Sequence, residues 1–352
     1  MKPRKATIEN RVFAYDLLRI LCAFLVIVTH TNSNLFKESS PQEGIWWFSI
    51  LWFYLSKIAV PIFVLISGAC LLEKTDSAKK SVARILRMLV VLILFSYFYF
   101  LYDAWVNYGL WPRAIQLQAF FSMLIQNGLT DSFWYLYFYI GLLLMLPFLQ
   151  RAVHTLSKQT LWAFVLICFF IDSLYPLIVH YLPQAKITDH LYIPIFSGYL
   201  GLFLSGYLLK DQKCSKTFIP IVVLIFCTLL CGVLTRIEYT KKTGIDYWKF
   251  LDDRMHPTIL TFTAAISVFL LVKQLCSDKR SDFVIAELGS CAFGIYLIQD
   301  FIIRISKNKL WNPLSLRIPA IPAMLLWEVS VFLVCLGISW MMRRIPPLKK
   351  WL

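Results

Sequence analysis

Residues 12–31 read VFAYDLLRILCAFLVIVTHT, and this run decides the fold class. Twenty residues, most of them apolar, extend about 30 Å as a helix, which is the thickness of the hydrocarbon core of a bilayer. Three side chains of the run, Asp16, Arg19 and His30, are ionisable. An ionisable group at membrane depth is costly and usually faces a protein interior or a water-filled cavity. The run therefore predicts a membrane-spanning helix whose polar side chains face a protein interior or a water-filled cavity.

The whole chain has the composition of a membrane protein. Of its 352 residues, 59% are hydrophobic and 16% are charged, and the mean hydropathy is +0.67. Soluble domains average about 45–50% apolar and about 25% charged residues, so a water-soluble enzyme is excluded. Disordered, collagen-like and disulfide-rich chains are excluded too. A transmembrane β-barrel needs alternating strands of about ten residues, and the apolar runs here are far longer. We predict an all-α, polytopic membrane helical bundle.

The apolar runs predict ten membrane-spanning segments. The second contains Pro61, which should bend it. The ninth is the weakest, because two glycines, Gln299 and Asp300 interrupt it. An apolar piece at 114–126 is too short to span and could lie in the interface or re-enter; eleven segments, with this piece crossing, is the alternative. The ten predicted segments lie near 12–31, 46–72, 86–106, 132–150, 160–179, 191–209, 217–235, 258–275, 285–303 and 320–342.

An even number of segments places both termini on one side of the membrane. Most of the 35 Lys and Arg residues then fall in the loops and tails on that side, which the positive-inside rule assigns to the cytoplasm. The basic loop at 304–317 is the exception. We predict one membrane domain, 1–352, with a helical core at 12–342 and short cytoplasmic tails at 1–11 and 343–352, in the cell (inner, cytoplasmic) membrane.

The positive charge and the cysteines do not indicate further ligands. The formal charge is +15, but the basic residues form short clusters at the ends of apolar runs, not a continuous basic face, so no nucleic acid is expected as a partner. The nine cysteines lie mostly within the predicted spans and form no Cys-x-x-Cys pair. Buried free cysteine behaves as a small hydrophobe, so no metal cofactor is expected.

One face of the first predicted helix carries the candidate chemistry. From Arg19 to His30 is eleven steps of about 100°, or about 1100°, which is within about 20° of the same face. Asp16 lies one turn before Arg19 on that side. The rise between Arg19 and His30 is about 16 Å, roughly half of the hydrocarbon thickness. Two interpretations stay open: a functional face, or an Asp16–Arg19 pair at the membrane entry with His30 at the exit.

Five segments of the chain, in order, resemble those of the membrane acyltransferase-3 family. The first resembles its opening motif, an Arg, ten residues and a His within the first helix, and is the most specific. The others resemble its apolar segment ending in Ser-Gly, its basic cytoplasmic segment, its Trp-containing span ending in a Pro, and its late Gly-Ile-Tyr-Leu segment. They are YDLLRILCAFLVIVTHT (15–31), VPIFVLISGACLL (60–72), Arg84 with Arg87, FWYLYFYIGLLLMLPFL (133–149) and GSCAFGIYLIQDFI (289–302).

The resemblance implies a ten-helix enzyme that takes an acyl group, usually acetyl, from cytoplasmic acyl-CoA. Acetyl-CoA would be a co-substrate. The acceptor would be a hydroxyl of a cell-surface carbohydrate, possibly lipid-linked, at or beyond the outer leaflet. The pattern is most similar to small O-acetyltransferases of the enterobacterial common antigen type. Two alternatives are a transporter or flippase, and a catalytically inactive family member that binds glycan.

His30, Arg19 and Asp16 are the candidate catalytic residues. A neutral imidazole titrates near pH 6.5, so His30 is suited to take the proton of a sugar hydroxyl as general base. Alternatively, His30 could itself be acylated and relay the group outward. Arg19 could hold a donor phosphate or the thioester oxygen, because a guanidinium gives planar paired hydrogen bonds. Arg84, Arg87 and Lys80 could bind the anionic nucleotide end of CoA, or could signal topology and contact anionic membrane lipids.

The remaining candidates would bind substrate. Ser67 could donate a hydrogen bond to the oxyanion, although helix packing is the favoured role. Trp134 and Tyr296 could form stacking walls, or simply mark membrane interfaces. Where the family often has a second His after Gly-Ile-Tyr-Leu, this chain has Gln299, followed by Asp300. Glutamine forms hydrogen bonds but carries no proton at neutral pH, so we favour a positioning role for Gln299.

Overall fold

The computed structural model describes residues 11–109, 117–186, 197–212, 216–241, 258–280 and 282–351. These residues form helices and no β-strand, which confirms the all-α prediction; one isolated bridge joins Val12 to Arg280. The helices are α2 (Phe13–Thr31), α3 (Ser33–Phe36), α4 (Gly44–Lys57), α5 (Ala59–Leu71), α6 (Ala78–Tyr108), α7 (Leu117–Ile125), η2 (Asp131–Phe133), α8 (Trp134–Thr155), α9 (Lys158–Phe169), η3 (Phe170–Leu174), α10 (Tyr175–Tyr181), η4 (Pro183–Ala185), α11 (Gly198–Leu209), α12 (Phe218–Lys241), α14 (Thr258–Leu275), α15 (Phe283–Ser306), η6 (Lys307–Trp311), α16 (Asn312–Ser315), α17 (Ala320–Met342) and α18 (Pro346–Lys349).

The helices agree with the predicted spans. Within the described ranges, nine helices or helix runs are long and apolar enough to cross a membrane. The tenth predicted segment, 191–209, ends in the shorter apolar helix α11, and its first residues, 191–196, lie outside the described residues. The piece at 114–126 contains the nine-residue helix α7, and its start also lies outside them. Nine residues of helix extend about 13.5 Å, which is too short to span a bilayer.

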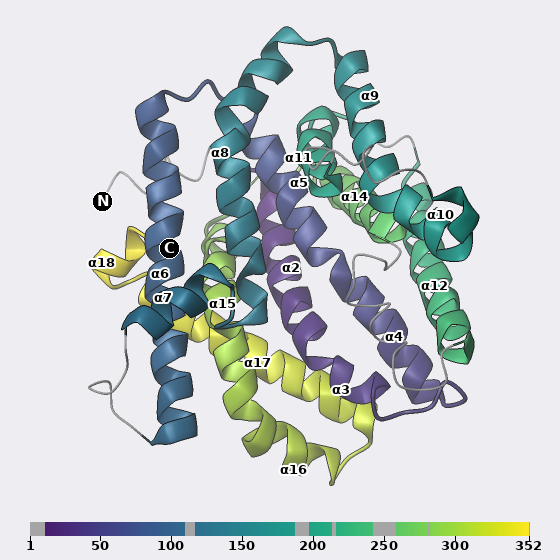
Figure 1. The fold of residues 1–352 in the computed structure, drawn as a ribbon, viewed down its shortest axis with the longest axis vertical. Helices are drawn as coiled ribbons and strands as arrows, with labels where there is room; N and C mark the ends of the chain where they lie inside the picture. The colour runs from purple at the N-terminus through teal and green to yellow at the C-terminus, as the bar shows by residue number, and fades with distance from the viewer. Residues whose placement is uncertain are drawn as a thin grey trace.

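Helix α2 is the centre of the bundle. It contacts α4, α5, α14, α15 and α17, and Figure 1 shows it in purple between α5 and the α15–α17 pair. Residues on all its sides are buried, as expected for a helix that is apolar around most of its circumference. A polar side chain on α2 therefore faces other helices, and its partners decide what it does.

The ninth predicted segment, which looked weakest, is a continuous helix that packs along α2. Its glycines, which suggested an interruption in the sequence, instead serve the packing of this helix on its neighbours. A Cβ at position 289 would lie 2.9 Å from the Cβ of Asp16, closer than two carbons can approach. Gly206 allows a similar approach of α11 to α5, because a Cβ there would lie 2.9 Å from the Cα of Leu65. Small residues that let helices approach closely are typical of membrane bundles.

The second predicted segment is bent, as Pro61 suggested. Helix α4 ends at Lys57 and α5 begins at Ala59, with Ile58 between them. Proline has no N–H to donate to the carbonyl four residues earlier, here that of Lys57, and its ring clashes with that carbonyl. The bend occurs where this hydrogen bond is missing.

The two ends of the described chain lie on one face of the bundle. Arg11, just before α2, donates from Nη1 to the Ser290 hydroxyl near the start of α15 at 2.8 Å. Arg87, near the start of α6, donates from Nε and Nη2 to the carbonyl oxygen of Trp351, at 3.1 Å each. Figure 1 likewise places α18 beside α6. We call this the terminal face; the charge bias of the sequence predicts that it is cytoplasmic.

Candidate functional site

A buried carboxylate holds two arginines at the terminal face. Asp16 accepts from Nε of Arg11 at 2.8 Å and from Nη2 of Arg11 at 2.5 Å, and it accepts from Nη1 of Arg19 at 2.7 Å. The Asp16 side chain is 0% exposed, whereas those of Arg11 and Arg19 are 30% and 29% exposed. We call these three residues the arginine cluster. It combines one negative charge, which is buried, with two positive charges that reach the surface.

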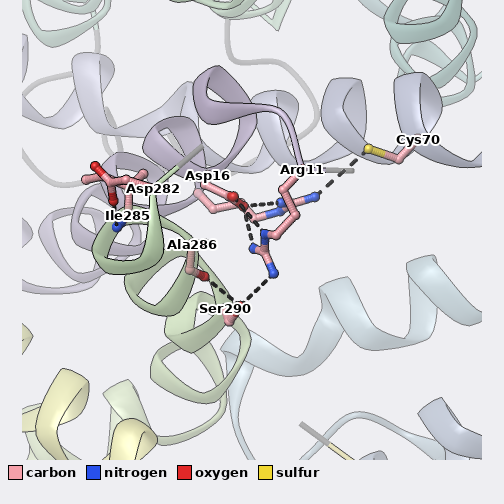
Figure 2. A network of polar contacts seen from close by, with 8 residues as sticks. Arg11, Asp16, Cys70, Asp282, Ile285, Ala286 and Ser290 are labelled. Atoms are coloured by element: carbon pink, nitrogen blue, oxygen red, sulfur yellow. Dashed lines mark hydrogen bonds and ion pairs between the residues drawn. The ribbon is translucent and has the colours of Figure 1, made fainter. Parts of the chain in front are cut away.

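Local sequence and packing explain this arrangement. Asp16 and Arg19 are one helical turn apart on α2, so their side chains meet. Arg11 precedes the helix and reaches back to the same carboxylate and across to Ser290 on α15, as Figure 2 shows. The hydrogen bond to Asp16 raises the pKa of Arg11, so its guanidinium stays charged. The net positive, partly exposed cluster is suited to an anion.

The structure confirms the Asp16–Arg19 contact and adds Arg11 to it. In the sequence, Arg11 looked only like one of the basic residues that set the topology. The signal that could have found it is the carboxylate five residues later, which at membrane depth needs neutralising. The thiol of Cys70 lies 4.0 Å from Nη2 of Arg19, at the limit of a hydrogen bond to sulfur.

At the opposite face, His30 lines a polar cavity of about 430 Å³. We call it the His30 pocket. Segments far apart in the sequence build it: the end of α2, the end of α6, the loop before α8 and the end of α15. The described residues that line it are His30, Asp103, Gly128, Leu129, Thr130, Asp131, Ser132, Asp300 and Arg304. His30 and Asp300, both predicted site residues, therefore meet in one cavity.

Arg304 organises the charges of the His30 pocket. Its guanidinium bridges Asp300, at 2.8 Å, and Asp103, at 3.0 Å. It also lies 5.6 Å from the ring centre of Tyr99. The Thr130 hydroxyl donates to Asp300 at 2.7 Å. Because α15 continues to Ser306, Arg304 lies on a helix and is paired with acids; the prediction placed it in the basic loop at 304–317.

Of the two predicted aromatic residues, Tyr296 contacts a residue that lines the pocket. The Tyr296 hydroxyl donates to the carbonyl oxygen of Ser132 at 2.5 Å, so this buried ring supports the pocket wall from behind. Trp134 is 39% exposed and its ring centre lies 5.8 Å from that of Tyr199. Neither aromatic residue is among the described lining residues. Their predicted stacking on substrate stays a prediction.

Gln299 lies next to Asp300 but is fully buried. Its side chain is 0% exposed, and neither its amide nitrogen nor its amide oxygen has a hydrogen-bond partner among the described residues. A buried amide without partners is costly, so such groups are uncommon in folded proteins. This is the position where the family pattern often has a histidine. The positioning role of Gln299 stays a prediction.

The arginine cluster and the His30 pocket are joined by α2 itself. The helix is continuous from Phe13 to Thr31, so Arg19 and His30 lie about 16 Å apart along one face. Between them on this face, Ala23 and Val26 are almost completely buried. The described lining of the His30 pocket does not include Arg19. The two polar sites are thus separated by packed apolar side chains.

The predicted basic cluster at the start of α6 is paired within the chain. Lys80 lies 2.8 Å from Asp76, and Arg84 donates to the same carboxylate. Gln150 donates to it at 3.0 Å. Burial alone would raise the pKa of Asp76, but the hydrogen bonds from Arg84, Lys80 and Gln150 outweigh burial and lower that pKa below its usual range. Arg87 instead donates hydrogen bonds to the carbonyl oxygen of Trp351, in the C-terminal segment. A role of these residues in binding CoA stays a prediction.

Ser67 has a local partner. Its hydroxyl donates to the carbonyl oxygen of Phe63, four residues earlier, at 2.8 Å. At the next position, Gly68, a Cβ would overlap the backbone of Phe203 on α11. Both observations agree with the packing role favoured by the sequence.

A second buried carboxylate lies near the C-terminal end of α2. Glu328 on α17 is 0% exposed and accepts from the Thr31 hydroxyl at 3.1 Å and from the Trp52 indole at 3.0 Å. It joins α17 to α2 and α4 next to His30. Among the described residues, no group of three or more His, Cys, Asp or Glu side chains could hold a metal ion.

Comparison with known proteins was made for the whole chain. No curated protein and no solved structure matched it. Residues 12–344 match the model of one family, described as an acyltransferase domain. This match covers nearly the whole chain; it includes Asp16 and Arg19 of the arginine cluster, the lining of the His30 pocket and all of α17. The chain therefore belongs to the acyltransferase-3 family.

Proposed function

We propose that this acyltransferase moves an acetyl group from cytoplasmic acetyl-CoA to a hydroxyl of a cell-surface or lipid-linked polysaccharide, across the inner membrane. One observation carries the proposal. A single central helix presents a cationic cluster at the terminal face and a histidine in a polar cavity at the opposite face. An anionic donor and a neutral hydroxyl acceptor are complementary to these two sites.

The arginine cluster is the proposed site of the donor phosphates. Phosphate is recognised well by planar guanidinium groups, which form paired hydrogen bonds that lysine cannot form. Arg11 and Arg19 are fixed on Asp16, and each keeps part of its side chain exposed. Lys80 and Arg84 share one carboxylate, Asp76, in the same charge balance, but they are less suited because only one of the two is a guanidinium.

His30 is the proposed general base for the acceptor hydroxyl. The hydroxyl oxygen forms a bond to the acetyl carbon as the hydroxyl proton moves to His30. The carbon–sulfur bond then breaks, and the proton passes from His30 to the sulfur of CoA. In the alternative, His30 first takes the acetyl group itself and then gives it to the hydroxyl. Gln299 and Asp300, next to each other on α15, would position the acceptor; Tyr296 and Trp134 would support that part of the site.

The packed segment of α2 between the two sites requires a movement. Ala23 and Val26 have to separate from their neighbours before the acetyl end of the donor reaches His30. A narrow, transient passage of this kind would keep water and ions from crossing with the donor.

Replacing Arg19 by Lys tests the donor site. The variant keeps the positive charge but loses the planar fork, so we expect KM for acetyl-CoA to rise about tenfold while kcat changes little. The measurement is transfer of labelled acetyl in membrane preparations over a range of acetyl-CoA concentrations. Arg151→Lys, at an exposed position near the end of α8, is the matched control and should behave like the wild type. An unaltered dependence on acetyl-CoA in Arg19→Lys would contradict the assignment.

A further inference from the structure

We infer that the sugar held in the His30 pocket is uncharged, and that sugars carrying a carboxylate or phosphate near the acetylated hydroxyl are rejected. This inference rests on the proposed function, because it concerns the acceptor of the same site. It comes from the charges and hydrogen-bonding groups of the pocket, which the residue pattern of the sequence did not reveal.

The described lining of the pocket is acidic. It contains three carboxylates, Asp103, Asp131 and Asp300, and one guanidinium, Arg304. With a neutral His30, these groups sum to a net charge of −2. A like charge brought within several ångströms of such a lining is repelled, and at a partly wet site one unit charge changes affinity by about tenfold.

The guanidinium of Arg304 is not available to offset this charge. It is bound between Asp300 and Asp103 and lies beside the ring of Tyr99. Its single positive charge is already outweighed by the two carboxylates that it binds, so a further carboxylate on the sugar would still meet a net negative lining. Arg304 therefore stabilises the pocket and does not select an anion.

The pocket offers mainly hydrogen-bond acceptors to a ligand. The Thr130 hydroxyl donates to Asp300 and accepts from the Ser132 hydroxyl at 3.0 Å, so the protons of both hydroxyl groups are already used. Asp131 is exposed at the rim of the pocket. A carboxylate only accepts hydrogen bonds, and each hydroxyl of a neutral sugar can donate one. A neutral sugar satisfies these acceptors, whereas an acidic group brings further acceptors and no donor.

Mass spectrometry of the product tests the inference. Membranes with the protein are supplied with labelled acetyl-CoA, and fragmentation of the surface glycan shows which sugar carries the label. We expect label on an uncharged sugar. Label on a uronate or on a phosphate-bearing sugar would overturn the inference while leaving acetyl transfer intact. No label on any glycan would contradict the proposed function itself, and the inference with it.

A competition experiment measures the charge effect directly. Methyl β-glucoside and methyl β-glucuronide differ in one carboxylate, and we expect the glucoside to inhibit label transfer about ten times more strongly. Asp131→Asn should reduce this difference several-fold, because it removes one charge from the rim. Glu38→Gln, at an exposed position outside the pocket lining, should leave the difference unchanged. Equal inhibition of the wild type by the two glycosides, strong or weak, contradicts the inference.

Discussion

His30→Ala should lower the rate of acetyl transfer by about 10²- to 10⁴-fold and leave the protein folded. This is the usual contribution of a positioned general base, and His30 is the one imidazole among the described residues that line the pocket. The measurement is the initial rate with saturating labelled acetyl-CoA, together with a melting curve. His154→Ala, at an exposed position near the end of α8, is the control and should transfer acetyl normally.

The same variant separates the two roles of His30. If the imidazole is acetylated, wild-type protein given labelled acetyl-CoA without acceptor should carry label, and His30→Ala should not. If the imidazole is a general base, neither protein should carry label. Transfer at the wild-type rate in His30→Ala would remove this residue from the mechanism.

Asp16→Ala should destabilise the protein by about 3 kcal/mol. Asp16 is fully buried and binds two guanidinium groups at the contact between α2 and α15, so its removal leaves two positive charges close together without the carboxylate between them. Breaking a buried pair by removing one member typically costs 3–5 kcal/mol, and the partial exposure of both arginines favours the lower end. The measurement is thermal unfolding of the purified protein in detergent. Asp278→Ala, an exposed acid, is the control.

A double variant tests the cause of this loss. Removing Arg11 as well as Asp16 takes away one of the two repelling charges, so Arg11→Ala should cost less in the Asp16→Ala background than in the wild type. Equal costs in the two backgrounds, or an Asp16→Ala variant that melts like the wild type, would show that the arginine cluster does not stabilise the contact.

The sequence predicted the helices well, because the length of an apolar run is a strong signal in a membrane protein. It also predicted the register of Asp16, Arg19 and His30 on one helix. Two predictions from the sequence were less accurate, those for the ninth segment and for the start of the third, and the structure explains both. The two glycines that interrupt the ninth segment permit close packing, Gly289 on α2 and Gly294 on α17. Lys80 and Arg84 lie on α6, which begins at Ala78 and not near 86.

The His30 pocket could not have been assembled from the sequence. Asp103, Thr130 and Arg304 come from three segments whose proximity depends on how α6, α8 and α15 pack. Each of these residues alone looked like an ordinary residue at the end of a span. The partners of Glu328 could not be found from the sequence either, because Thr31 and Trp52, which donate hydrogen bonds to its carboxylate, lie 297 and 276 residues earlier in the chain.

A transfer assay with separated substrates tests the central claim, that donor and acceptor approach α2 from opposite faces. The protein is reconstituted into sealed vesicles, its orientation is determined by protease accessibility, and lipid-linked glycan is enclosed while labelled acetyl-CoA is added outside. We expect label to reach the enclosed glycan only through molecules whose terminal face points outward. Transfer that occurs only when acetyl-CoA and glycan are on the same side would contradict the account.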